Sequence, residues 1–84
     1  MTKQELLNSL ATLPLRNLET DVDLDGSRFL VFVVSSDFSG MEETERQRLV
    51  WGHLRERFGD YDLVKVMFVF TDSPEEVAAA ASAE

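Results

Sequence analysis

The chain has 84 residues, a formal net charge of −8 at pH 7, 44% hydrophobic residues and no cysteine. This length suits one small domain, which we expect to span residues 1–84. The missing cysteine excludes disulfides, a thiol nucleophile and cysteine-ligated metal sites, and the negative charge disfavours generic binding to phosphate backbones. The sequence shows no charged-then-apolar leader and no long apolar run, so we expect a cytoplasmic protein outside the membrane.

The chain begins with the pattern of an amphipathic helix. Thr2-Lys3-Gln4-Glu5 is a capping box, in which two side chains satisfy free N–H groups at a helix start. Leucines follow at helical spacing, and Pro14 disfavours continuation. These signals predict a first helix over residues 3–12.

Between residues 18 and 25 the hydrophobic period changes to two. Apolar residues and Thr20 alternate with four acidic residues, which predicts a half-buried strand with an acidic outer face, Glu19, Asp21, Asp23 and Asp25. Alternate strand positions spread their carboxylates apart, so we interpret this row as solvated and not as a cation site. Turn residues at 25–27 precede a second strand over residues 28–34, and the pair predicts a hairpin.

A second helix is predicted after this hairpin. Ser39-Gly40-Met41-Glu42 reads as its capping box, and Gly59 can close it. Gln47 falls at the centre of its apolar face, where we expect it to hydrogen-bond at the turn. Arg46 and Arg48 project to opposite flanks, and we interpret both as surface charges that complement the helix dipole.

The rest of the chain predicts a third strand over residues 63–70 and a final helix that starts at Ser73-Pro74. Residues 78–84 extend this short helix or fray. The predicted class is α+β, in the order αββαβ(α), with a three-stranded mixed sheet and helices packed on one face. The same order matches the type II KH arrangement, although the Gly-x-x-Gly loop that KH domains use to grip nucleotides is missing.

Four segments, in this order, resemble the BolA family. Residues 27–40 look like its second strand and Phe-x-Gly turn, residues 46–50 like its Arg-His-Arg helix motif, residues 64–69 like its third strand, and residues 73–77 like its Thr-Pro-Glu-Glu-Trp ending. The resemblance covers nearly the whole chain and implies the same αββαβ fold. It singles out six motif positions, Phe38, Gly40, Arg46, Gln47, Arg48 and Lys65.

The chain departs from the family at its histidines. Arg28, Gln47 and Lys65 stand where the family has histidines, the last of them an iron ligand, and Val77 replaces the terminal Trp. The resemblance implies pairing with a monothiol glutaredoxin around a shared iron–sulfur cluster. An ammonium has no lone pair for iron, and an amide is a far poorer ligand than imidazole. We therefore expect no metal site and no cofactor of this chain's own, and a cluster shared with a partner is disfavoured.

No catalytic constellation is recognisable. The chain has no Ser-His pair with an orienting group and no glycine-rich phosphate loop, so we expect no catalytic residues and no enzyme. The one histidine, His53, is predicted as a solvated residue on the flank of the second helix. A cluster held by His53 with ligands from a partner stays as an alternative.

Apolar residues on both faces of the inner strands predict a surface for a partner. Strict alternation places Phe68 and Phe70 on the face of Val66, and Met67 and Val69 on the other. With helices on one side only, the second sheet face has little to cover it except the C-terminal segment. We select three candidate partner-binding residues, Leu49, Met67 and Val69.

The function predicted from these patterns is a non-enzymatic protein-interaction or regulatory module. Its partner would be a monothiol glutaredoxin-like protein, or a second copy joined through the sheet. The alternative is a KH-like nucleic-acid-binding transcriptional regulator, which the fold and the family's link to transcription suggest. The missing loop and the net charge of −8 make nucleic acid the less favoured partner.

Overall fold

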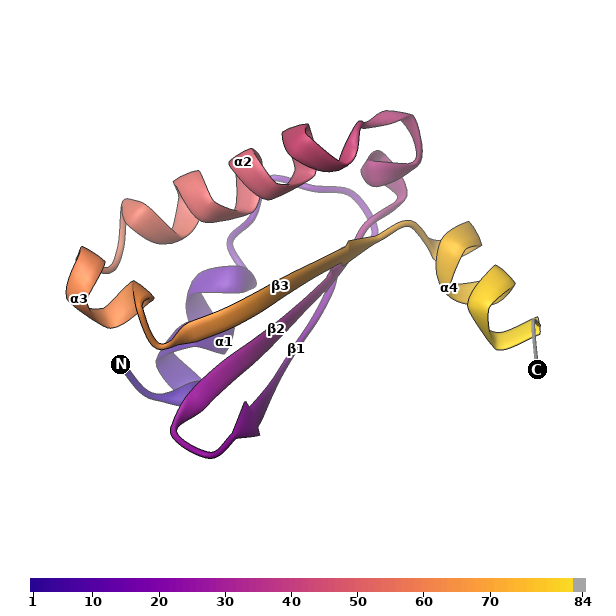
Figure 1. Ribbon diagram of the computed structural model, residues 1–84. Helices are drawn as coiled ribbons and strands as arrows, with labels where there is room; N and C mark the ends of the chain where they lie inside the picture. The colour runs from indigo at the N-terminus through magenta and orange to yellow at the C-terminus, as the bar shows by residue number, and fades with distance from the viewer. Residues whose placement is uncertain (83–84) are drawn as a thin grey trace.

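The computed structural model describes residues 1–82, and Figure 1 shows their arrangement. One sheet holds three strands in the order β1-β2-β3, with β1 antiparallel to β2 and β2 parallel to β3. The predicted α+β class with a three-stranded mixed sheet is confirmed. The elements are α1 (Lys3–Leu10), β1 (Glu19–Asp25), β2 (Arg28–Val34), a 3-10 helix η1 (Ser36–Gly40), α2 (Glu43–Arg55), α3 (Asp60–Leu63), β3 (Val66–Asp72) and α4 (Pro74–Ser82).

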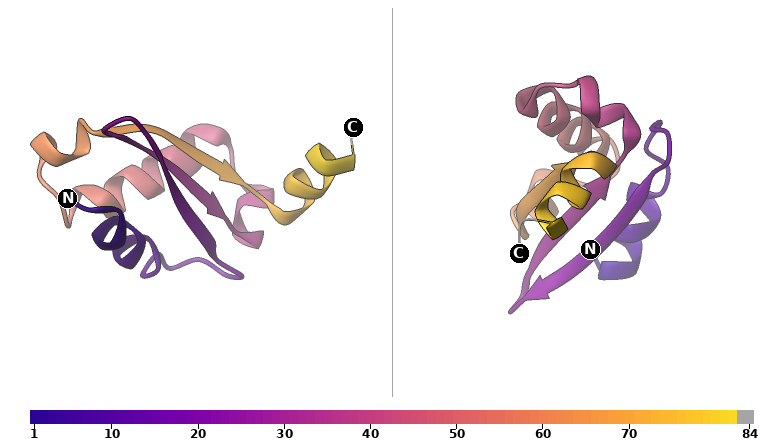
Figure 2. Two further views of the ribbon diagram at one scale, coloured as in Figure 1. Left: turned by 90° about the horizontal axis from the view of Figure 1, so that it is seen from below. Right: turned by 90° about the vertical axis from the view of Figure 1, so that its right-hand side faces the viewer.

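Helices α1 and α2 lie on the same side of the sheet, as predicted, with α1 against β1 and α2 against β3 (Figures 1 and 2). The core lies between these layers and includes Leu6, Leu10, Val31, Val50 and Leu54, each fully buried. Burying such side chains contributes about 1.5–3 kcal/mol each. Helix α4 projects beyond the end of the sheet (Figure 1). Within residues 1–82, no helix has the length and apolar character needed to cross a membrane.

The predicted start of the chain is confirmed in its details. The Glu5 N–H donates to Thr2 Oγ1 at 3.1 Å and the Thr2 N–H donates to Glu5 Oε1 at 2.9 Å, which completes the capping box. Helix α1 ends at Leu10, two residues before the predicted boundary. Boundaries are the least certain part of such predictions because terminal turns tighten and fray.

The predicted hairpin is also confirmed. Its register runs from Glu19 opposite Val34 to Asp25 opposite Arg28, across a turn in which Gly26 takes a left-handed φ of 64°. All four acidic residues of β1 are exposed, as expected of a solvated row. Leu24, which alternation places inward, is 51% exposed at the hairpin end.

The predicted capping box at Ser39 is wrong. Residues 36–40 form η1, and the Ser39 hydroxyl donates to the Ser36 carbonyl at 2.8 Å. Ser35 caps η1 instead, because its Oγ accepts from the Asp37 N–H at 3.1 Å. Helix α2 then begins at Glu43 without a side-chain cap. Phe38 is buried inside η1, and Ser39 is part of this 3-10 helix, so it is not available to cap α2.

The predicted third strand begins too early. Residues 60–63 form α3, and β3 starts at Val66. Gly59 precedes α3 with an ordinary φ of −73° and does not close α2, which ends at Arg55. Leu63 is buried from a helical turn, and a short apolar run cannot distinguish that position from a strand.

A bulge in β3 changes which of its residues reach the core. Phe29 pairs with Val66 while Leu30 pairs with Phe68, so one extra residue, Met67, interrupts the alternation. Val66 and Val69 are therefore both buried, whereas Phe68 is 55% exposed. The expected shared face for Val66 and Phe68 is wrong, and so is the expected surface position of Val69.

Candidate functional site

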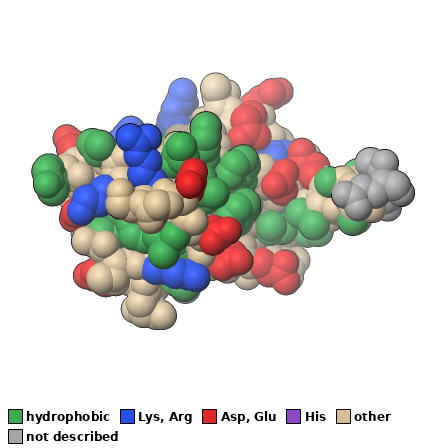
Figure 3. Space-filling model, turned by 60° about the horizontal axis from the view of Figure 1, so that its bottom comes forward, with side chains coloured by type: hydrophobic (Ala, Val, Ile, Leu, Met, Phe, Trp, Pro, Cys, Tyr) green, Lys and Arg blue, Asp and Glu red, His purple; other side chains and the backbone are tan. Residues whose placement is uncertain are grey.

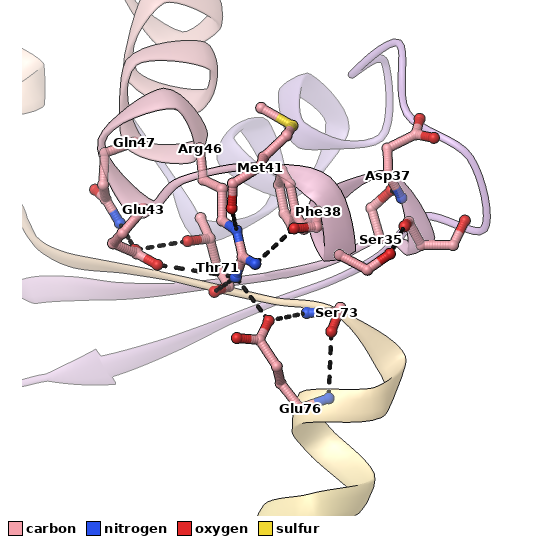
Figure 4. Close-up of polar contacts among 12 residues, drawn as sticks. Ser35, Asp37, Phe38, Met41, Glu43, Arg46, Gln47, Thr71, Ser73 and Glu76 are labelled. Atoms are coloured by element: carbon pink, nitrogen blue, oxygen red, sulfur yellow. Dashed lines mark hydrogen bonds and ion pairs between the residues drawn. The ribbon is translucent and has the colours of Figure 1, made fainter.

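Arg46 lies buried where α2, η1, β3 and α4 meet (Figure 4). Its Nε donates to the Met41 carbonyl at 3.1 Å, and its two terminal nitrogens donate to the carbonyls of Phe38 at 2.5 Å and Thr71 at 3.2 Å. The Glu76 carboxylate accepts a further bond at 2.6 Å. The guanidinium carbon also lies 5.5 Å from the centre of the Phe38 ring. The interpretation of Arg46 as a surface charge is therefore wrong.

This Arg46 junction, which comprises Phe38, Met41, Arg46, Thr71 and Glu76, fixes the turn after β2 to the end of β3. A buried guanidinium is stable only when its donors are paired, and here they are paired by carbonyl groups of η1 with its C-cap, by a carbonyl group of β3 and by the Glu76 carboxylate of α4. Gly40 contributes no comparable constraint, because a Cβ added there would meet nothing within 4 Å. Among the motif positions of this turn, Phe38 and Arg46 have a clear structural role.

The pKa values of two carboxylates near the junction, Glu76 and Asp72, are shifted in opposite directions. The predicted start of α4 forms, with the Ser73 N–H donating to Glu76 Oε1 at 2.7 Å and the Glu76 N–H donating to Ser73 Oγ at 3.2 Å. The Ser73 N–H, together with Arg46, lowers the pKa of Glu76. Burial raises the pKa of Asp72, and the negative charges of Glu76 and Glu43 raise it further.

Gln47 holds α2 against β3. Its Nε2 donates to the Val69 carbonyl at 2.7 Å and to Glu43 Oε1 at 3.1 Å, while its Oε1 accepts from the Trp51 indole at 3.1 Å. The expected hydrogen bonding is present, but its partners are β3 and α2 and not the turn. With the Arg46 bond to Thr71, it satisfies two carbonyls along the edge of β3 that faces away from β2.

Lys65 lies at the other end of the sheet, immediately before β3. Its ammonium is 5.7 Å from the centre of the Tyr61 ring, and its main-chain oxygen accepts from the Phe29 N–H at 2.8 Å. The length of β3, roughly 20 Å, separates it from Arg46. The structure therefore does not bring the six motif positions together into one site.

His53 joins α2 to the end of α1. Its Nε2 lies 2.9 Å from the Ser9 carbonyl and 2.9 Å from Thr12 Oγ1. A carbonyl only accepts, so Nε2 carries the hydrogen, and the lone pair of Nδ1 faces Arg57 Nη1 at 3.4 Å. The expected solvated position is wrong, because His53 is half-buried. In residues 1–82, no three His, Cys, Asp or Glu side chains gather in a way that could hold a metal ion.

Leu49, selected from the sequence as a candidate partner-binding residue, is half-buried and packs against the core. It lines a shallow hollow of about 300 Å³ together with Met41, Glu45 and Arg48. Arg48 itself is exposed, as expected. A role of Leu49 in partner binding stays a prediction.

The sheet face opposite α1 and α2 is open and apolar. Residues of β2 that alternate with the buried ones contribute to it, and so do the residues displaced outward by the β3 bulge. The Phe32 and Phe70 rings stack with centres 5.1 Å apart and an interplanar angle of 13°, and Phe68 follows at 5.9 Å from Phe70. We call this set the open sheet face: Leu30, Phe32, Val34, Phe68 and Phe70.

Figure 3 views the molecule from this side and shows hydrophobic side chains gathered over the sheet with acidic side chains beside them. Helix α4 packs against η1 and the end of β3, and it leaves Phe68 55% and Phe70 42% exposed. The C-terminal segment, as far as residue 82, therefore does not cover this face. Sequence reasoning foresaw an uncovered face but selected Met67 and Val69 for it. Of these, Met67 is 38% exposed and Val69 is buried.

Comparison with known proteins identifies the fold. No protein-family model matches the chain, and no curated protein sequence is similar enough to match it. A Bol-like protein from Babesia bovis is 21% identical with a TM-score of 0.62, over 96% of this chain and 94% of that one. BolA1 from Arabidopsis thaliana is 24% identical with a TM-score of 0.58, over 88% of this chain and 93% of that one. The chain has a BolA-like fold.

The resemblance inferred from the four segments is thus confirmed for the fold, and it spans nearly the whole chain. The positions that the same resemblance assigns to histidines carry a guanidinium, an amide and an ammonium. The amide of Gln47 is engaged by three partners, and the ammonium of Lys65 lies over an aromatic ring. This set of side chains does not fit an iron–sulfur cluster.

Proposed function

We propose that this chain is a divergent BolA-like protein-interaction module that acts without catalysis and without iron–sulfur ligands of its own. The open sheet face supports this proposal most directly. It presents three neighbouring phenylalanine rings, of which Phe68 and Phe70 are exposed and Phe32 is half-buried, and exposed apolar area of this kind commonly marks a protein interface.

The proposal that this chain has no iron–sulfur ligands rests on the side chains at the positions where the BolA family has histidines. Lys65 offers no lone pair while protonated, and Gln47 is committed to holding α2 on β3. His53 is committed to α1, and its second nitrogen faces a guanidinium. A cluster would require these contacts to break before a partner's ligands could be joined.

The partner class that the BolA resemblance suggests is a monothiol glutaredoxin-like protein. Co-expression of the two proteins, followed by size-exclusion chromatography and absorbance spectroscopy, tests both parts of this statement. We expect a colourless complex. A cluster absorbance band that is lost in His53→Ala would contradict the absence of cluster ligands.

The interaction function itself is tested by affinity capture from an extract of the source organism. Phe70→Thr alters the open sheet face and Leu49→Asp alters the hollow beside α2, while Val64→Thr changes a residue that is 79% exposed elsewhere. We expect at least one captured protein to be lost in Phe70→Thr or Leu49→Asp and retained in Val64→Thr. An unchanged captured set in both would overturn the proposal.

Nucleic-acid binding gains no support from the structure. The aromatic rings of the open sheet face could stack on bases, but the carboxylates of β1 lie beside them and would repel phosphates.

A further inference from the structure

We propose that the open sheet face binds a cationic amphipathic helix supplied by a partner protein. The inference rests on the proposed function and names the chemistry of the segment that this surface recognises. Three observations carry it: the dimensions of the apolar strip, its position opposite the helical layer, and the charges along one side of it.

The strip has the dimensions of a short helix. Leu30 to Val34 spans five residues of β2, or roughly 13 Å, and the phenylalanines of β3 widen the strip by one strand. Apolar residues at positions i and i+7 of a helix are about 10.5 Å apart, so two to three turns cover the strip. Because α1 and α2 already cover the other face, a helix bound here completes a three-layer packing.

The charges beside the strip select the helix's polar side. In the hairpin register, Asp21 lies opposite Phe32 and Asp23 opposite Leu30, with Glu19 next along the same row. Asp72 pairs with Val34 and adds a carboxylate at the end of the strip. The strip is therefore flanked by carboxylates along β1, a complement to Lys and Arg on the flank of a bound helix.

The same charges act against other occupants. A second copy would bring two chains of net charge −8 together through faces that carry the same acidic row. Helix α4 of another copy begins with Glu75 and Glu76, which this row would also repel. Single-stranded RNA could stack on the phenylalanines, but its phosphates meet carboxylates where binding grooves normally present Lys and Arg. A cationic amphipathic segment can pack apolar side chains on the phenylalanine rings and place positive charges beside the carboxylates of β1.

The test uses a designed peptide of about 14 residues, with leucines at i, i+3, i+4 and i+7 and lysines on its flanks. The control peptide keeps the leucines and replaces every lysine by glutamate. Titration is followed by amide chemical shifts of the full chain. We expect the lysine peptide to perturb amides of β2 and β3 and to bind at least roughly tenfold more tightly than the glutamate peptide, with affinity falling as salt rises.

Matched variants locate the site. Phe70→Thr should lower the affinity for the lysine peptide roughly tenfold. The double change Asp21→Asn, Asp23→Asn should lower this affinity several-fold and reduce its dependence on salt. Val64→Thr should bind as the unaltered chain does. The Asn pair keeps the side-chain shape at exposed positions, so it reports on binding even if Phe70→Thr lowers stability.

Four outcomes overturn the inference: equal binding of the two peptides, shifts confined to α2, tighter binding of a uridine oligonucleotide to the same amides, or concentration-dependent self-association through this face. None of them removes the proposed function if Leu49→Asp still abolishes capture of a partner. Conversely, the proposed function fails alone if the lysine peptide binds the open sheet face but no captured protein depends on either surface.

Discussion

The Arg46 junction and the open sheet face occupy different parts of the molecule and use their residues in opposite ways. At the junction, residues that match the BolA motifs are buried and fully engaged in holding segments together. On the open sheet face, the residues lie outside the short motif positions, and Phe68 and Phe70 are exposed while Leu30, Phe32 and Val34 are half-buried. The contrast teaches that a motif resemblance can identify what stabilises a fold while the proposed binding surface lies elsewhere.

Removing the junction's charge should give the largest effect. Arg46→Met leaves carbonyls of Phe38, Met41 and Thr71 without their donor, and we expect the free energy of unfolding to fall by about 3 kcal/mol. Arg48→Met, two residues along the same helix but exposed, should change it by about 0.5 kcal/mol or less. Urea unfolding measures both. Equal effects would show that the motif arginines are surface charges after all.

The β3 bulge predicts a second, smaller contrast between adjacent parts of one strand. Val69→Ala removes buried methyl groups and should cost about 2 kcal/mol of unfolding free energy. Met67→Ala, at the bulge, should cost about 0.5 kcal/mol. Thermal denaturation of the two variants distinguishes this register from regular alternation, in which Met67 and Val69 would share one face and respond alike.

Gln47 is expected to have a structural role at its motif position, where it joins α2 to β3. Gln47→Ala deprives the Val69 carbonyl and the Trp51 indole of their partner, and we expect a loss of about 1 kcal/mol. Gln4→Ala, which removes an exposed amide from α1, serves as the matched control and should have little effect. If chemical unfolding gave the same midpoint for both variants, Gln47 would not contribute to holding α2 against β3.

The smallest effects concern pH. Glu76 has a lowered pKa, so its stabilising contribution is present above its ordinary value of 4.5 and is lost as pH falls through the folded-state value. Asp72 has a raised pKa, so the folded state gains stability as pH falls through the folded-state value toward 3.8. The two trends oppose each other.

Variants of the two carboxylates separate these trends. The free energy of unfolding, measured with urea between pH 7 and pH 3, should fall less steeply with decreasing pH in Glu76→Gln than in the unaltered chain. In Asp72→Asn it should fall more steeply. If Asp72→Asn flattened the loss instead, the assignment of opposite directions would be wrong.

The sequence predicted the fold well because its strongest signals are local and regular. The Thr2 capping box, the period of two in β1 and the turn at Gly26 all formed as expected. Prediction failed where the regular pattern is interrupted. Ser39 belongs to a 3-10 helix that was not predicted from the sequence, and the extra residue at Met67 places Phe68 and Phe70 on the sheet face opposite to that of Val66.

The candidate site was only half predictable for the same physical reason. An uncovered apolar face follows from chain length and helix count, but its members depend on the bulge. The burial of Arg46 had one available signal: its proximity in sequence to the turn around Phe38, whose free carbonyls need donors. His53 gave no comparable signal, because its partner at Ser9 lies 44 residues away in the chain.

The central claim is that the open sheet face binds a partner while the exposed motif position Lys65 does not. The most direct measurement compares the affinities of Phe70→Thr and Lys65→Met for a captured partner protein, with the unaltered chain as reference. We predict that Phe70→Thr weakens binding roughly tenfold and that Lys65→Met leaves it unchanged. A loss of binding in Lys65→Met with full affinity in Phe70→Thr would contradict the account.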